Sequence, residues 1–573
     1  SLNASALAGK FTATLAGDKV AVSLGQKDST VNFAATLNND DSVTGGAGKD
    51  TLTASASGLT ATTGALKIAN VETINLTTGG NNTLDLSGVT GTGVTVAVTD
   101  NVQTITGFDL AHTIALGVGN DFSATSSEID VTATDATGSN DTLKVSVENT
   151  NGTTSSIIDA SSIENLALTV VAAGSATLDL TTFEGNAVTL ASKAGVTGTG
   201  TVNLGTMHKN INSVTSTYAG KVTANFSNNT AGVTFTGAGT AIQNVTGTAK
   251  ADTVTIGSTG AITHVVSGGA GTDTVNLTAK NGLVHVGSID AENVNIAVTA
   301  GDDVTITTSF GTGVDNIGLT GGNSLSTFTT GTLVDEVKTL NSSAFGGNIV
   351  ATVANDKLDS TVVFTGGAST KDEVNVTLAT AATTYALKST GVEILRVDNN
   401  IAGTSTVSVA DATGISEIEV DQGADVATQT VSISGLTGSE TITLKASDDN
   451  TAGANEHILK AVLADATGTA DTIKFKVGGG TIDADARLAT DDIETVTIDS
   501  DNAATLDLSL LAMTAAADRM KLVVTGDSAL TATLTGADIT TIDAAGMTTG
   551  GSFVQNGRSA TDAVTYTGSA GAD

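Results

Sequence analysis

The sequence predicts an all-β fold, an irregular right-handed parallel β-solenoid with glycine-rich turns and few short helices. Three observations predict it. Polar and apolar residues alternate strictly in many short stretches, a glycine-rich nonapeptide occurs twice in nearly the same form, and a longer unit of about twenty residues recurs along the chain.

The alternating stretches are the predicted strands. A period of two places one set of side chains in a core and the other in solvent, as in a half-buried strand. The clearest stretches are residues 11–24, 94–100, 143–149, 374–380 and 473–477. Helical periodicity is scarce, and we expect residues 452–465 and 509–520 to form helical caps or insertions.

The nonapeptides at residues 45–53 and 268–276 follow the pattern G-G-x-G-x-D-x-U-x, where U is a large aliphatic residue. Glycine permits the positive backbone angles of a tight turn, and the aliphatic residue points into a narrow core. The Asp carboxylate and the turn carbonyls are hard oxygen ligands of the kind that Ca²⁺ takes. The pattern therefore predicts calcium-binding turns.

Thirteen residues are candidate calcium ligands, through carboxylates or backbone carbonyls. Nonapeptides alternate between the two edges of an ideal roll, so Asp41 and Asp50 would supply half-sites on opposite edges. The alternative is that each Asp caps its own turn through a backbone hydrogen bond, as an Asx-turn. The candidates are Asp41, Gly45, Ala47, Asp50, Asp141, Asp252, Gly268, Ala270, Asp273, Asp372, Asp471, Asp562 and Asp573.

The longer unit is a D-T-U turn followed by a strand, another turn and an I/V-E-x-U-x-U strand. From Asp to Glu the separation is 19 to 23 residues, which fits one coil of a solenoid. The Glu residues could be ligands from neighbouring coils, but we favour turn or ladder residues that keep the sheet edges polar. The pairs are Asp50 with Glu72, Asp141 with Glu164, Asp273 with Glu292, Asp372 with Glu393, and Asp471 with Glu494.

The composition narrows the function. The chain has 573 residues, enough for a long solenoid, and no Cys, which excludes disulfides, thiolate metal sites and thiol catalysis. A formal net charge of −35 disfavours nucleic acid and anionic membranes and favours divalent cations. No apolar run is long enough for a membrane span, so no membrane insertion is expected. We expect three solenoid segments, at residues 1–240, 241–420 and 421–573.

The D-T-U turns, the I/V-E-x-U-x-U strands, the Thr-, Ala-, Gly- and Asn-rich filler and the lack of Cys resemble surface-layer proteins of Gram-negative bacteria. The most similar type is the RTX-related class known from Caulobacter and Campylobacter. The resemblance implies an extracellular, cell-surface protein that leaves by type I secretion and builds a two-dimensional lattice with Ca²⁺. It also implies lipopolysaccharide anchoring through a region that this sequence lacks. Residues 568–573 open another nonapeptide, so we expect the lattice-forming portion of a longer protein.

Three other functions are less consistent with the sequence. An RTX-type secreted adhesin would share a calcium-rigidified solenoid, but should carry a compact ligand domain of distinct composition. An ice-binding solenoid would repeat T-x-T at one rung position, whereas T-x-T here has no constant pitch in the sequence. An enzyme is not expected, because the histidines lie apart, no HExxH occurs, and aromatic residues make up only 3%. The five histidines are His112, His208, His264, His285 and His457.

Overall fold

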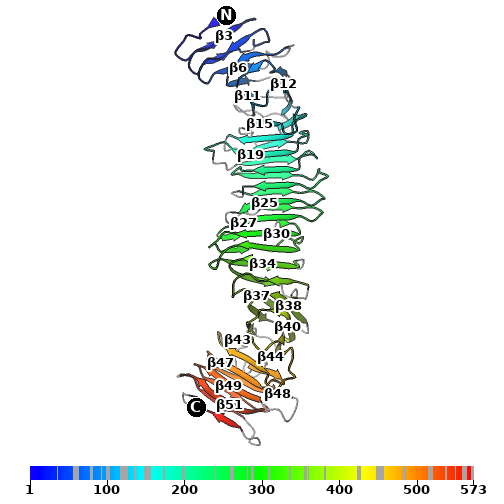
Figure 1. The fold of residues 1–573 in the computed structure, drawn as a ribbon, viewed down its shortest axis with the longest axis vertical. Helices are drawn as coiled ribbons and strands as arrows, with labels where there is room; N and C mark the ends of the chain where they lie inside the picture. Colours follow the sequence, from blue (N-terminus) through cyan, green and yellow to red (C-terminus); the bar gives the residue numbers. More distant parts are fainter. Residues whose placement is uncertain are drawn as a thin grey trace. The chain divides into compact units, whose positions relative to one another are not determined.

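The computed structural model is built of β-strands, and its described part contains no helix. Successive strands of each sheet pair in parallel and stack as turns of a β-solenoid, which confirms the predicted fold class (Figure 1). The structure describes residues 1–573 except 35, 56–63, 78–81, 92, 99–102, 117–126, 135–136, 148–155, 172–174, 197–199, 239–240, 259–263, 281, 285–288, 307–309, 334–336, 354–357, 359–360, 380–382, 423–427, 447–456, 480–481, 483–485, 514–519, 536–537, 549, 558–563 and 570–573.

The chain divides into two compact units, which meet in sequence between residues 279 and 294. No observation tests the three predicted segments at residues 1–240, 241–420 and 421–573, so they stay a prediction. The described residues contain no helix that could cross a membrane.

The first unit has two sheet faces, between which the chain alternates. One face holds β1 (Leu2–Asn3), β3 (Ala21–Ser23), β5 (Ser42–Thr44), β7 (Lys67–Ala69) and β10 (Val89–Thr90), and then β9 (Asn82–Asp85), β12 (Gln103–Phe108), β14 (Ser127–Ala133), β16 (Ser156–Ala160), β18 (Ala176–Asp179), β20 (Thr201–Thr206), β22 (Lys221–Asn225), β24 (Gln243–Thr246), β26 (Val265–Ser267) and β29 (Ile289–Asp290). The other face holds β2 (Thr12–Thr14), β4 (Thr30–Asn32), β6 (Thr51–Ser55), β8 (Thr73–Thr77), β11 (Thr95–Val98), β13 (Thr113–Leu116), β15 (Thr142–Val147), β17 (Asn165–Val170), β19 (Ala187–Ser192), β21 (Ser213–Ser216), β23 (Thr234–Gly237), β25 (Thr253–Ser258) and β27 (Thr274–Ala279).

The second unit repeats this arrangement with longer strands. One face is a 13-stranded sheet of β28 (Gly282–Val284), β31 (Val304–Ile306), β33 (Thr327–Leu333), β35 (Asn348–Val353), β37 (Glu373–Leu378), β39 (Ile394–Asn399), β41 (Glu417–Asp421), β43 (Thr441–Ala446), β45 (Thr472–Val477), β47 (Thr495–Ser500), β49 (Met520–Gly526), β51 (Ile539–Met547) and β53 (Thr565–Thr567). The other face holds β30 (Asn293–Val298), β32 (Asn316–Gly321), β34 (Thr339–Phe345), β36 (Val363–Thr365), β38 (Thr384–Thr390), β40 (Gly403–Thr413), β42 (Gln429–Leu436), β44 (His457–Leu463), β46 (Ala486–Asp491), β48 (Ala504–Ala512), β50 (Leu530–Thr533) and β52 (Phe553–Asn556).

The core is a set of stacked aliphatic columns. In β17 every second residue is buried and its neighbours are partly exposed, as the alternating sequence predicts. Along one face of the first unit, each inward residue lies on the inward residue of the next turn, in the column Val31, Leu52, Ile74, Val96 and Ile114. All five are fully buried. Each such side chain contributes about 1.5–3 kcal/mol by leaving water, so the columns hold the turns in register.

The outward threonines of the same face also stack. Thr30 pairs with Thr12 and with Thr51, and the column continues on each following turn to Thr113. One outward threonine of each strand thus keeps a constant position on the turn, whereas the second threonine of Thr12–Thr14 lies beside Asn32. The spacing varies because the turns between strands differ in length, whereas the strand register is kept.

The two predicted helices are wrong where the structure describes them. Residues 457–463 form β44, with alternating burial, and residues 509–512 end β48. Ala, Leu and Lys favour helices on their own, but here each strand pairs on both sides and buries every second side chain. Tertiary pairing overrides the local preference. Residues 452–456 and 514–519 lie outside the described residues.

Candidate functional site: carboxylates at the turns

The five Asp–Glu pairs of the repeating unit form one recurring contact. In every pair, the Glu carboxylate of one turn accepts a hydrogen bond from the backbone N–H of the Asp on the preceding turn. The N–O distances are 2.7 Å for Asp50 and Glu72, 2.9 Å for Asp141 and Glu164, 2.6 Å for Asp273 and Glu292, 3.0 Å for Asp372 and Glu393, and 2.8 Å for Asp471 and Glu494. The separation of 19 to 23 residues is thus the length of one turn.

The backbone carbonyl of each Asp is bound by the same neighbouring turn. The carbonyl of Asp50 accepts the N–H of Thr73, and that of Asp273 accepts the N–H of Asn293. Each Asp is the residue just before a strand, where the parallel ladder starts. The Glu side chain therefore supplies an acceptor for an N–H group that the ladder does not reach, at about 1.5–3 kcal/mol for a hydrogen bond to a charged group.

The turn at residues 45–53 shows why its glycines are needed. Asp50 is fully buried, and its Oδ1 accepts the N–H of Ser29 at 2.8 Å while its Oδ2 accepts the N–H of Gly46 at 2.7 Å. A Cβ atom on Gly45 would overlap the carbonyl oxygen of Asn70 on the next turn. Gly45 thus lets the next turn approach closely, while the Asp50 carboxylate joins its own turn to the preceding one.

The turn at residues 268–276 extends the same contact over several turns. Asp252 Oδ1 accepts the N–H of Val233 at 2.8 Å, and Asp273 Oδ1 accepts the N–H of Asp252 at 2.8 Å. Asp273 in turn donates its N–H to Glu292. A Cβ on Gly268 would overlap the Asp273 carboxylate, so only glycine fits there. Asp252, Asp273 and Glu292 thus form a chain of hydrogen bonds across three successive turns.

The remaining predicted aspartates also bind backbone amides. Asp372 is fully buried and accepts N–H groups from Ile349 and Gly367 at 3.0 and 2.7 Å. Asp41 accepts from two amides, at 2.7 and 2.9 Å. Asp141 and Asp471 each accept a single N–H from their own turn, at 3.0 and 3.1 Å, in line with the absence of the double glycine. Asp562 and Asp573 lie outside the described residues.

Burial raises the pKa of several of these carboxyls. It is the largest cause for Asp273, whose pKa is raised further by the neighbouring charges of Asp252 and Glu292, despite the hydrogen bond from the Asp252 amide. Burial likewise raises the pKa of Asp372 and of Glu393. Desolvation of a charged carboxylate thus outweighs the stabilising amides at these turns.

Nothing in the structure tests the calcium ligands predicted at the turns, which stay a prediction. Asp50 and Asp372 each direct both carboxylate oxygens at backbone N–H donors. Asp41 and Asp50 precede strands on opposite faces, so they do not form a joint site. Within the described residues, no group of three or more His, Asp or Glu side chains is placed to hold a metal ion. Ala47 and Ala270 are exposed turn residues, whose carbonyls stay candidate ligands.

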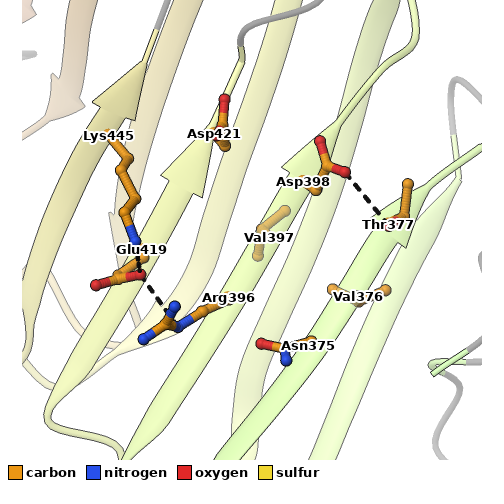
Figure 2. A pocket seen from close by; sticks show the side chains of 9 residues that line it. All are labelled: Asn375, Val376, Thr377, Arg396, Val397, Asp398, Glu419, Asp421 and Lys445. Carbon is orange, nitrogen blue, oxygen red and sulfur yellow. Dashed lines mark hydrogen bonds and ion pairs between the residues drawn. The ribbon is translucent and has the colours of Figure 1, made fainter. Parts of the chain in front are cut away.

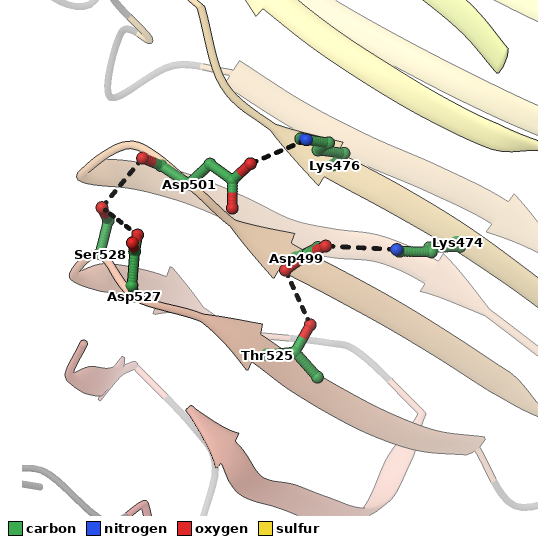
Figure 3. A network of polar contacts seen from close by, with 7 residues as sticks. All are labelled: Lys474, Lys476, Asp499, Asp501, Thr525, Asp527 and Ser528. Atoms are coloured by element: carbon green, nitrogen blue, oxygen red, sulfur yellow. Dashed lines mark hydrogen bonds and ion pairs between the residues drawn. The ribbon is translucent and has the colours of Figure 1, made fainter. Parts of the chain in front are cut away.

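The sequence reasoning missed a row of ion pairs on the outer surface of the 13-stranded sheet (Figure 3). Lys474 pairs with Asp499 at 3.2 Å and Lys476 pairs with Asp501 at 2.8 Å, each with an acid on the next turn. Arg396 lies between Glu373 and Glu419, 3.1 Å from each. The available signal was the stretch IKFKV, in which lysines occupy the outward positions of a strand. Its partners could not be found without the register.

Buried histidines were also missed. The side chains of His112, His264 and His457 are almost completely inaccessible, although their positions in the sequence suggested no site. His264 Nδ1 accepts the N–H of Gln243 at 3.2 Å. Burial lowers the pKa of His264 to about 4, so this imidazole is neutral at pH 7.

No protein-family model matches the chain, and a search of curated proteins gives no match either. The function is therefore inferred from the fold and from the contacts at the turns.

Proposed function

We propose that this chain is a structural surface-layer protein that assembles with copies of itself, in a Ca²⁺-dependent way, into a two-dimensional lattice on the outside of a bacterial cell. The observation that supports it most is the use of the recurring acids. The Asp and Glu residues of the repeating unit form hydrogen bonds that join one turn to the next, which suits a solenoid under mechanical load. No catalytic grouping stands out among the described residues.

In this proposal Ca²⁺ binds between neighbouring copies of the chain. The buried turn carboxylates already bind amides, so ions would act at exposed acids and turn carbonyls. A net charge of −35 makes copies of the chain repel one another, and divalent cations reduce that repulsion. Assembly, more than folding of a single chain, is the step that should require Ca²⁺.

Electron microscopy of the purified chain tests the proposal directly. With Ca²⁺ we expect ordered sheets with a two-dimensional repeat, and with a chelator we expect dispersed particles. Mg²⁺ at the same concentration is the control for simple charge screening. Dispersed particles in the presence of Ca²⁺ would contradict the proposed lattice function.

A further inference from the structure

One outer surface of the first unit carries almost no charge. It is the face that runs from β2 to β27, and its described outward side chains, which we call the threonine face, are threonine, serine, asparagine, alanine and glycine with one exception. The exception is Lys144 on β15. A chain with a formal net charge of −35 therefore keeps every acid off the strands of this face.

The other outer surfaces carry charged side chains. On the opposite face of the first unit, Asp130 and Asp159 point outward and pair in register on neighbouring strands. In the second unit, Arg396 and Lys445 both contact Glu419 on the outside of the 13-stranded sheet (Figure 2). The lack of charge is thus specific to the threonine face and does not follow from the solenoid fold itself.

The threonines of this face stack in columns. Thr189 pairs in register with Thr215, and the same column continues to Thr236 and then to Thr255. The side chains of Thr189 and Thr215 are exposed. Neighbouring strands lie about 4.8 Å apart, so each strand adds a hydroxyl and a methyl group to the outer surface at a regular interval.

A second copy of this chain is the partner that suits such a surface. A hydroxyl both donates and accepts hydrogen bonds, so two identical threonine faces can satisfy one another, whereas two identical acidic faces repel. A twofold pair brings the same patch of both copies together. The long, flexible stem of Lys144 lets its ammonium reach the solvated rim of the contact. We propose that the threonine face of one copy packs against the threonine face of a second copy.

The threonine face is large enough for a stable pair. About a dozen steps between neighbouring strands, at about 4.8 Å each, give a length of roughly 60 Å, and strands of about four residues give a width of roughly 13 Å. The product is about 800 Å² on each partner, which is the size of a standard protein–protein interface. The contact needs no cation, so the inference goes beyond the lattice function and does not rest on it.

Sedimentation equilibrium of the full chain in a chelator tests the proposal, and we expect the wild type to be a dimer. Thr215→Lys places a cation inside the threonine face and should weaken the dimer about tenfold, although it reduces the negative net charge and hence the general repulsion between copies. The matched control is Thr223→Lys, the same change in the middle of β22 on the opposite face, which should leave the dimer unchanged.

Thermal unfolding shows whether each variant keeps the fold, and Thr189→Lys in the same column replaces Thr215→Lys if the latter melts early. A monomeric wild type would overturn the proposal, and so would a dimer that both of these lysine variants leave unchanged. A monomer that instead binds ice, or an insoluble polysaccharide such as cellulose, would overturn it by giving the face another partner.

The lattice function and this inference fail separately. Sheets that form with Ca²⁺, from a chain that is monomeric in chelator, would contradict the paired threonine faces alone. Dimers in chelator that never form sheets with Ca²⁺ would contradict the lattice function alone.

Discussion

At the residue scale, a Glu carboxylate takes the place of a backbone carbonyl as the acceptor for the N–H of the turn Asp. Each Glu of the repeating unit binds the N–H of an Asp one turn earlier, and the carboxylates of the buried Asp50 and Asp372 bind an amide of the turn before their own. Such carboxylates carry a cost of desolvation, which the raised pKa of Asp372 records. They are tolerated because each satisfies backbone amides near the start of a strand.

Asp50→Ala should destabilise the first unit by about 1–3 kcal/mol, because the amides of Ser29 and Gly46 would be left buried without an acceptor. Urea unfolding followed by circular dichroism measures the effect. Asp40→Ala is the matched control, since Asp40 is exposed and its ion pair with Lys19 is long, at 3.8 Å. Equal destabilisation by both changes would show that the Asp50 contacts contribute little.

His264 makes the first unit sensitive to acid. Its pKa is lowered by burial from 6.5 to about 4, so neutral His264 stabilises the fold above pH 6.5. That stability is lost as the pH falls toward 4, by up to about 3 kcal/mol. The wild type should lose more stability between pH 7.5 and 4.5, in urea unfolding, than His264→Gln does. Parallel pH profiles for the two proteins would contradict this account of His264.

Glu393 acts in the opposite direction in the second unit. Burial raises its pKa, so ionised Glu393 lowers the stability at neutral pH, and stability is gained as the pH falls toward the ordinary value for Glu. Glu393→Gln keeps an acceptor for the Asp372 amide and removes the charge. We expect the variant to be at least as stable as the wild type at pH 7.5, with a weaker gain on acidification, as measured by thermal unfolding. A variant that is less stable at pH 7.5 would argue against desolvation as the dominant effect.

At the element scale, the strands follow from alternation, and the turns follow from glycine and Asp. The sequence alone predicted both. It also predicted the length of a solenoid turn, because that length equals the number of residues between the paired Asp and Glu. It could not predict which residues meet across turns, since turns of unequal length hide the register of Thr12, Thr30 and Thr51. It also assigned residues 457–463 to a helix, because pairing on both sides of β44 is not visible in the local preference.

The ion pairs on the outer surface give a prediction for this scale. Arg396→Ala would leave Glu373 and Glu419 close together without their shared cation, whereas Lys521→Ala breaks one exposed pair with Asp543. We expect a larger loss of stability for Arg396→Ala, by roughly 1 kcal/mol, because exposed pairs contribute about 0–1 kcal/mol. Thermal unfolding at low salt compares the two, and a high-salt scan should reduce the difference. An equal effect would show that the shared cation adds nothing.

At the scale of the whole molecule, the repeating unit predicted a solenoid, and the solenoid is observed. The described aspartates that the sequence predicts as calcium ligands lie at the turns, but the sequence alone could not separate the two interpretations of each Asp, calcium ligand or turn acceptor. The same tight turn suits both, because glycine and Asp are needed either way. The direction of each carboxylate favours the turn acceptor for the buried residues.

We propose that carboxylates join turns within one chain, whereas cations act between chains. A thermal scan recorded by circular dichroism and light scattering together, with Ca²⁺ and with a chelator, tests it most directly. We expect dispersed chains to unfold at the same midpoint with and without chelator. We expect strong light scattering below that midpoint only when Ca²⁺ is present. A midpoint that falls sharply when a chelator is added to dispersed chains would contradict it, because the internal carboxylate contacts would then be insufficient to hold the fold.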